Sequence, residues 1–228
     1  MVVTRANLSK ALRRLGLTRY EAALSALARP AIRIRPVPCK DDDIPLGGSK
    51  FGGKPDLTHG FDWPVHDGLP LSFIAQFDCR ELQRFEAGAL LPSDGLLSFF
   101  YDVEEQPWGH DPADAGASRV LYHAAGGGLK RRAKPPELEA AFRANRLEFN
   151  EVLTFPTDSG FEVEPAEIGA LTALFAPSIS HREHRLFGYP NVIQNPMELQ
   201  CQLASHGVYV GNDYPRDAVA RWGAGAAA

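Results

Sequence analysis

The sequence predicts an α+β protein, with a largely antiparallel β-sheet and a helical arm at its N-terminal end. Three observations support this class. Helical patterns fill residues 7–28 before any strand pattern begins, three strand patterns follow one another between residues 71 and 124, and helices and strands do not alternate regularly. We therefore expect two parts in the 228 residues, a helical arm at 1–30 and a single α+β domain at 31–228.

Two short helices are expected in the arm. Leucines at helical spacing form one face of the first helix, Gly16 interrupts the pattern, and Thr18 with Glu21 has the capping-box spacing that begins the second helix. A helix-turn-helix reader of DNA has a similar pattern, but no second basic element follows, so we favour packing of the arm against the body. The early Arg and Ser residues are also typical of a transit peptide, and we prefer a basic surface helix.

Five segments after the arm have strand patterns. The run "AIRIRPV" alternates, and Pro36 and Pro38 end it or mark an edge. The run "LSFIAQF" (71–77) is almost continuously apolar, as in a strand that is buried on both faces, and "GLLSFFY" (95–101) is its expected antiparallel neighbour. The runs "SRVLYHA" and "RLEFNEVLTF" complete the set.

Three further helices are expected in the body. One begins at Pro135 and runs to about Asn145, and the second is "PAEIGALTALFAP". The third is "NPMELQCQLASHG", in which Asn195 is the expected N-cap, Glu198 completes a capping box and Gly207 ends the helix. The segment "GGGLKRR" between the strands and these helices is expected to be a mobile loop.

The Gly-rich segment "LGGSKFGGKPDL" (46–57) has the spacing of a phosphate-binding P-loop from Gly48 to Lys54. Pro55, however, stands where the magnesium-binding Ser or Thr is required, no buried strand precedes the segment, and no helix opens after it. We interpret it as an irregular loop whose glycines adopt positive φ or allow a close backbone approach. We expect no nucleotide and no other cofactor.

The loop at 40–70 is long for a compact domain, so we expect it to be functional or to be pinned by its own side chains. Phe51, Phe61 and Trp63 are the expected pins. Gln76 and Asp78 are polar residues at the end of an apolar strand, and each costs about 1–3 kcal/mol if it finds no partner. They either tie down the loop or line a pocket beneath it, and we favour the tie.

No catalytic or metal-binding motif is evident in the sequence. His181 and His184 in "HREH" are spaced three apart, unlike the metalloprotease patterns, and no third ligand is identifiable, so we expect no metal. The three cysteines lie far apart without paired spacing, which favours a reducing compartment, the cytoplasm. Trp108 in "EEQPWGHDP" is expected at a loop tip, where it is either an exposed interaction residue or folded back over the sheet edge.

Charge is unevenly distributed along the chain. Residues 1–36 hold eight basic residues and one acidic residue, a net charge of +7, and the remaining residues have a net charge of −11. The acidic body is a poor nucleic-acid binder and a plausible acceptor of a basic protein partner, although a solvated acidic face is the simpler explanation. No apolar run approaches the roughly 20 residues that span a bilayer, so no membrane role is expected.

Several motifs in order resemble the YwqG-like family of bacterial proteins, a domain of unknown function. They are "SKFGGKPDL", "GFDWP", "PLSFIAQFD", "LPSDGLLSFFYD", "EVLTFP" and "HRLFGYPNVIQNPMELQCQLASHGVYVGN", and they cover about residues 45–215. The resemblance implies an α+β fold with extensive antiparallel sheet and implies no catalytic activity.

The resemblance also implies a pseudo-repeat of two related halves, which open at Phe51-Gly52-Gly53 and at Phe187-Gly188-Tyr189-Pro190. Family members continue into two further strands after the region that ends this chain at Ala228. Either the chain is a fragment, or the missing strands leave a sheet edge that another chain fills.

Two functions remain open from the sequence. The first hypothesis is a non-enzymatic protein-interaction module with an immunity-like role, which masks a basic partner. The alternative is a small-molecule-binding protein or hydrolase that uses a cleft under the 40–70 loop. That cleft would be lined by Trp63, Gln76, Asp78 and His184.

Overall fold

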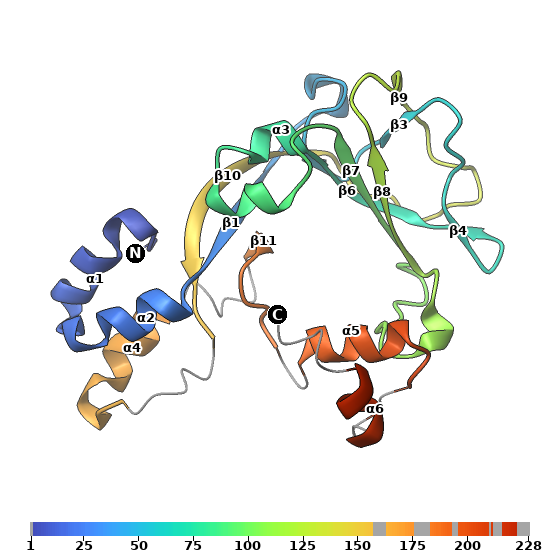
Figure 1. The fold of residues 1–228 in the computed structure, drawn as a ribbon. Coiled ribbons are helices and arrows are strands. Elements are labelled where there is room, and N and C mark those ends of the chain that lie inside the picture. The colour runs from blue at the N-terminus through green and yellow to red at the C-terminus, as the bar shows by residue number, and fades with distance from the viewer. Residues whose placement is uncertain are drawn as a thin grey trace. The chain divides into compact units, whose positions relative to one another are not determined.

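A computed structural model describes residues 2–156, 163–175, 183–192, 196–209, 211 and 216–222 (Figure 1). The chain forms two compact units, each assembled from segments that are distant in the sequence. The first unit comprises Met1–Val37, Cys79–Ser93 and Leu147–Asn191. The second unit comprises Pro38–Asp78, Asp94–Arg146 and Val192–Ala228.

The main element is an antiparallel sheet of seven strands in the order β11-β1-β10-β2-β6-β7-β8, which confirms the predicted fold class. Its strands are β1 (Arg29–Pro38), β2 (Lys50–Phe51), β6 (Ser72–Asp78), β7 (Leu96–Tyr101), β8 (Ser118–His123), β10 (Asn145–Thr154) and β11 (His184–Phe187). Two small sheets pair β3 (Asp56–Thr58) with β9 (Leu129–Arg131) and β4 (Val65–His66) with β5 (Leu69–Pro70). The five segments with strand patterns all lie in this main sheet, so those predictions are confirmed.

The helices are short. They are α1 (Leu8–Leu15), α2 (Glu21–Leu27), α3 (Cys79–Leu82), α4 (Ile168–Phe175), α5 (Met197–Ser205) and α6 (Arg216–Trp222). No helix within the described ranges is long and apolar enough to cross a membrane.

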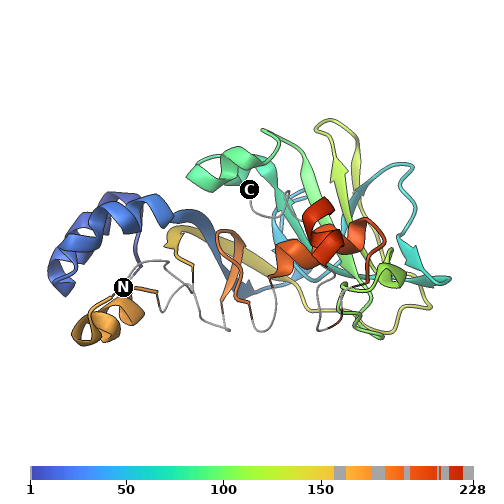
Figure 2. The same cartoon turned by 60° about the horizontal axis from the view of Figure 1, so that its bottom comes forward.

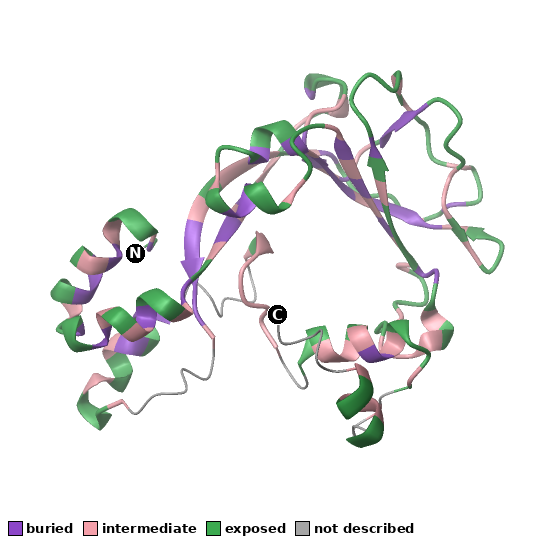
Figure 3. Cartoon of the chain, viewed as in Figure 1, coloured by how far each residue is buried: buried purple, intermediate pink, exposed green. Residues whose placement is uncertain are grey.

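The first unit packs the predicted helical arm against β10 and α4 (Figures 1 and 2). Leu12, Leu17 and Leu24 of the arm have no solvent exposure, and the buried residues of α1, α2 and α4, coloured purple in Figure 3, belong to one apolar cluster. The rings of Phe155 and Phe175 stack at 4.9 Å in the same core. Apolar burial of this kind stabilises helices that are too short to persist alone.

The second unit places an apolar cluster beside β6 and β7. Leu57, Leu71, Phe73 and Phe100 are buried together, and Trp63 packs against them. The indole Nε1 of Trp63 donates to the Leu71 carbonyl at 2.8 Å, and its ring meets Phe100 edge-on at 5.5 Å. Trp63 therefore pins the 40–70 loop, as predicted.

Two predictions between residues 126 and 145 are wrong. The segment after Pro135 is irregular rather than helical, with a turn at 136–137, because two of its carbonyls bond outside the segment: Phe142 accepts from Gly53 at 2.9 Å, and Ala144 accepts from Cys39 at 3.3 Å. Tertiary hydrogen bonds thus override a helical pattern. The "mobile loop" at 126–132 contains β9, which is held in register against β3.

Two helix ends were also predicted. Thr18 forms no capping box, because a 3₁₀ turn over Thr18–Tyr20 precedes α2, and its N-cap Tyr20 makes no side-chain cap bond. Helix α5 ends before Gly207, whose φ of +76° favours glycine, as predicted. The expected cap Asn195 lies outside the described residues.

The Gly-rich segment has the structural role that we expected, in which a glycine allows a close backbone approach. Gly52 has φ +61°, and a Cβ placed there would lie 2.4 Å from the Arg143 carbonyl oxygen and 2.8 Å from that of Phe142. Only glycine allows the irregular 135–144 segment to approach residue 52 so closely.

We expect Gly52→Ala to destabilise the fold by about 1–3 kcal/mol more than Gly128→Ala, because the added methyl overlaps backbone atoms. Gly128 is the matched control, since it has φ +67° and no atom within 4 Å of the added Cβ, so it isolates the cost of positive φ, about 1–2 kcal/mol. Urea unfolding of both variants measures the difference. Equal destabilisation of the two variants would show that the close backbone approach at Gly52 does not contribute to the cost of the substitution.

Candidate functional site

Three polar side chains from neighbouring strands line up on one face of the main sheet. Lys50 on β2 lies opposite Gln76 on β6, and Gln76 lies opposite Ser98 on β7. Residues directly opposite one another in a sheet project from the same face. All three side chains are fully buried.

Asp56 on β3 covers this face and bonds Gln76 twice. The Gln76 amide donates through Nε2 to Asp56 Oδ2 at 2.8 Å, and its Oε1 accepts from the Asp56 backbone N–H at 2.9 Å. Gln76 Nε2 also donates to the Gly48 carbonyl at 2.8 Å. Both amide hydrogens of Gln76 are thus bonded to the 40–70 loop.

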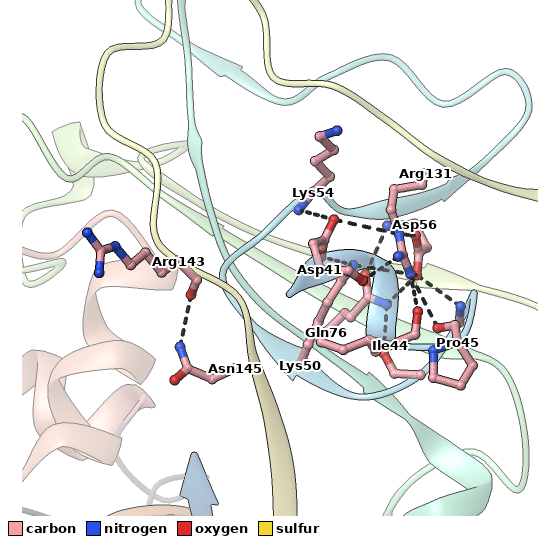
Figure 4. A network of polar contacts seen from close by, with 12 residues as sticks. Asp41, Ile44, Pro45, Lys50, Lys54, Asp56, Gln76, Arg131, Arg143 and Asn145 are labelled. Atoms are coloured by element: carbon pink, nitrogen blue, oxygen red, sulfur yellow. Dashed lines mark hydrogen bonds and ion pairs between the residues drawn. The ribbon is translucent and has the colours of Figure 1, made fainter. Parts of the chain in front are cut away.

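Two cations and two carboxylates complete the network (Figure 4). The Lys50 ammonium lies 3.0 Å from Asp41 Oδ1 and 3.8 Å from Asp56 Oδ2. Arg131 donates through Nε to Asp56 Oδ1 at 2.8 Å, through Nη1 to the Asp41 carbonyl at 2.6 Å, and through Nη2 to the Ile44 carbonyl at 2.9 Å. Arg131 therefore fastens the β3–β9 pair to the turn at 41–45.

The pKa values show how strongly the network holds its charges. Burial on its own would raise the pKa of Asp56, but hydrogen bonds from Arg131, Gln76 and the Gly47 N–H outweigh it and hold that pKa below its ordinary value of 3.8. Burial lowers the pKa of Lys50, and Asp41 and Asp56 oppose this shift. The surrounding hydrogen bonds and ion pairs thus offset the cost of burying the charge fully for Asp56 and only in part for Lys50.

A second feature is the acidic loop at 102–117, which we call the Trp108 loop. It contains five carboxylates, His110, and neither Lys nor Arg. Asp102 Oδ1 accepts from the N–H groups of Glu104 at 3.2 Å and Glu105 at 3.1 Å, and Asp114 Oδ2 accepts from Gly109 at 3.1 Å. The Tyr101 hydroxyl donates to the Pro107 carbonyl at 2.8 Å. The loop is therefore fixed by its own side chains.

This fixed loop presents an aromatic side chain to solvent. Trp108 is 85% exposed, which decides between the two interpretations of the sequence in favour of an outward indole. Glu104 and Glu105, four and three residues before it, are exposed as well. The His110 ring lies 5.8 Å from the ring of Tyr209, which is also exposed.

Comparison with known proteins assigns the chain to a family. Residues 49–222 match a family described as Domain of unknown function (DUF1963). The chain belongs to the DUF1963 family. No curated protein matches it.

The DUF1963 domain places the predicted site residues in different environments. Gln76 is confirmed as a tie of the 40–70 loop, and the backbone N–H of Asp78 donates to Ser49 Oγ of that loop at 2.9 Å. Trp63 is the pin described above, and Trp108 lies at the exposed loop tip. His184 lies on β11, in the first unit, whereas the other four belong to the second.

Sequence reasoning missed Lys50, Asp56 and Arg131, although they carry most of the charge in the network. Arg131 lies 75 residues from Asp56 in the sequence, and no local pattern signals their pairing. His123 was also missed. Its Nδ1 lies 3.1 Å from Thr58 Oγ1, burial lowers its pKa, and its Nε2 has no partner within the described ranges.

The described part of the DUF1963 domain contains no group of three or more His, Cys, Asp or Glu residues that could hold a metal ion. In the buried network, the carboxylates of Asp41 and Asp56 face Lys50 and Arg131 instead. What this arrangement does chemically is to close the loop onto the sheet.

We expect Asp56→Asn to cost about 3–5 kcal/mol of unfolding free energy, because it leaves Lys50 and Arg131 with one fewer buried counter-charge. Asp62→Asn in the exposed part of the same loop is the control and should change stability by less than about 0.5 kcal/mol. Chemical denaturation at neutral pH compares the two variants. Similar midpoints for both would contradict the role of the network.

The depressed pKa of Asp56 also predicts a pH dependence. Because the folded-state pKa lies below the unfolded one, this stabilisation is fully present above the unfolded pKa and is lost as the pH falls through the folded one. The stability difference between wild type and Asp56→Asn should therefore shrink on acidification. Denaturation midpoints measured from neutral to acidic pH test this, and a constant difference would refute it.

Proposed function

We propose that this DUF1963 domain is a non-enzymatic protein-interaction module that binds a basic segment of a partner through the Trp108 loop. The observation that supports this most directly is the 85% exposure of Trp108 on a loop that its own side chains hold in place. Tryptophan is the residue type most enriched among residues that dominate binding energy, and an exposed one is costly unless it serves contact.

Charge supports the choice of a basic partner. The loop carries five carboxylates and no basic side chain, and the carboxylates of Glu104 and Glu105 have no partner among the described residues. A cationic Lys or Arg side chain could stack on the indole while its charge pairs with these glutamates. Rigidity of the loop would lower the entropic cost of this contact.

The alternative, a small-molecule site under the 40–70 loop, has less support. It requires Gln76 to face a ligand, yet both amide hydrogens of Gln76 are bonded to Gly48 and Asp56. Trp63 is likewise engaged through its Nε1.

We further propose that the chain is a bacterial, cytoplasmic member of the YwqG-like group, with an immunity-like role in masking its partner. The ordered motifs from "SKFGGKPDL" onward support the group. The cysteines Cys39, Cys79 and Cys201 are free thiols, which suits a reducing compartment.

Trp108→Ala should weaken binding of the partner by about thirtyfold, as expected when a residue that dominates an interface is lost. The partner is first captured from a host lysate on immobilised wild-type chain, then purified and titrated by calorimetry. Leu90→Ala is the control, because Leu90 is a similarly exposed apolar residue (72%) in the other unit and should bind as wild type does.

The dependence of the binding affinity on salt concentration provides a second test. Binding should weaken steeply with ionic strength, and Glu104→Gln with Glu105→Gln should reduce that dependence. A partner that binds Trp108→Ala as tightly as wild type would overturn the proposed surface. Salt-insensitive binding would overturn electrostatic masking.

A further inference from the structure

The first unit contains a groove that the proposed function does not use. Its volume is about 560 Å³, within the range of small-molecule sites, and all of its lining belongs to that unit. The lining residues are Val2, Thr4, Asn7, Arg33, Arg35, Asn150 and Glu151.

The walls of this groove are fixed. The Val3 carbonyl accepts from the Leu153 N–H of β10 at 2.7 Å, which anchors the N-terminal segment to the sheet. Asn7 uses both ends of its side-chain amide to shape that segment, accepting from the Thr4 N–H at 2.9 Å and donating to the Val2 carbonyl at 3.1 Å. Asn7 is therefore a positioning residue.

Two arginines supply the charge of the groove. Arg33 and Arg35 are two residues apart on β1, so they project from the same face, about 7 Å apart along the strand. Arg33 is held by Glu183 at 2.6 Å, and Arg35 by Glu148. Each of these ion pairs is made through one terminal nitrogen of the guanidinium.

The remaining polar groups give the groove an excess of hydrogen-bond donors. Each guanidinium has five N–H groups, and the other nitrogens of Arg33 and Arg35 have no protein partner in the described ranges. Asn150 is exposed, and its amide is likewise without a partner there. Against these donors stands one lining carboxylate, Glu151, whose Oε1 already accepts from the Glu86 N–H at 3.1 Å.

Positive charge continues beside the groove. Arg185 on β11 lies directly opposite Arg33 in register, and burial lowers the pKa of its guanidinium, with Glu183 opposing the shift. Like charges that face each other across two strands destabilise a sheet. An anion in the groove would relieve this repulsion.

From this donor-rich groove we infer that Arg33 and Arg35 form a binding site for a small dianionic compound, with one oxyanion group on each guanidinium. Phosphoryl and carboxylate groups share this chemistry, because both match the planar fork of arginine. The glutamates around the arginines disfavour densely charged polyanions. The site goes beyond the proposed function, since both arginines and the N-terminal wall precede residue 49, where the family match begins.

Calorimetric titration near neutral pH with two dianions, phosphonoacetate and succinate, at low ionic strength tests the site and separates its two sources of oxyanion. We expect one or both to bind, and Arg33→Gln and Arg35→Gln to weaken that binding about tenfold or more each. Arg19→Gln is the matched control, because it also removes an exposed ion pair of the first unit, with Glu167, and lies outside the groove. It should bind as wild type does.

Glu151→Gln separates binding from a purely structural role of these residues. The amide oxygen can still accept from the Glu86 N–H, but the negative charge is gone, so affinity for the bound anion should rise several-fold. Absence of binding by both probes at millimolar concentrations would overturn the inference. Binding that Arg33→Gln and Arg35→Gln leave intact, or that Arg19→Gln reduces equally, would overturn it as well.

Discussion

A lysine ammonium without any solvent exposure has to be neutralised inside the protein, and this constraint organises the second unit. Lys50 is fully buried, and an isolated charge there would be far less stable than the same charge in water. Its two carboxylates come from Asp41, before the Gly-rich segment, and from Asp56, near the end of that segment. The chain segments before and after Lys50 are therefore both held close to the strand that carries it.

The same carboxylates fix segments that are distant in the sequence. Asp56 also binds Gln76 of β6 and Arg131 of β9, so one side chain connects three strands. Such a network is a weak source of net stability, because desolvation offsets most of the ionic attraction. It is a strong source of specificity, since any other pairing of β3 or β9 would leave a buried charge unmatched.

The five long strands and four of the helices could be predicted from the sequence, because their signals are local. The alternating and apolar runs gave the main strands, and leucine spacing gave α1. The segment at 135–144 could not be predicted, because its helical pattern competes with hydrogen bonds to Gly53 and Cys39, which are far away in the chain. β9 was missed for a similar reason, since its three residues form a strand only against β3.

The candidate site was likewise predictable only in part from the sequence. The polar character of Gln76 in an apolar strand was enough to predict a tie, because burial demands partners wherever they come from. The identity of the partners was not predictable, since Gly48 and Asp56 lie 28 and 20 residues from Gln76 in the chain and no local pattern signals the pairing. Exposure of Trp108 also depended on the structure, because the sequence allowed both an inward and an outward indole.

The second unit and the family match begin at different residues. The match begins at residue 49, yet the second unit begins at Pro38 and includes Asp41. Asp41 supplies the nearer carboxylate to Lys50, and its carbonyl accepts from Arg131. Without the segment before residue 49, Asp56 would be shared between two cations, one of them fully buried. The residues that precede the family match therefore complete the charge balance on which the matched domain depends.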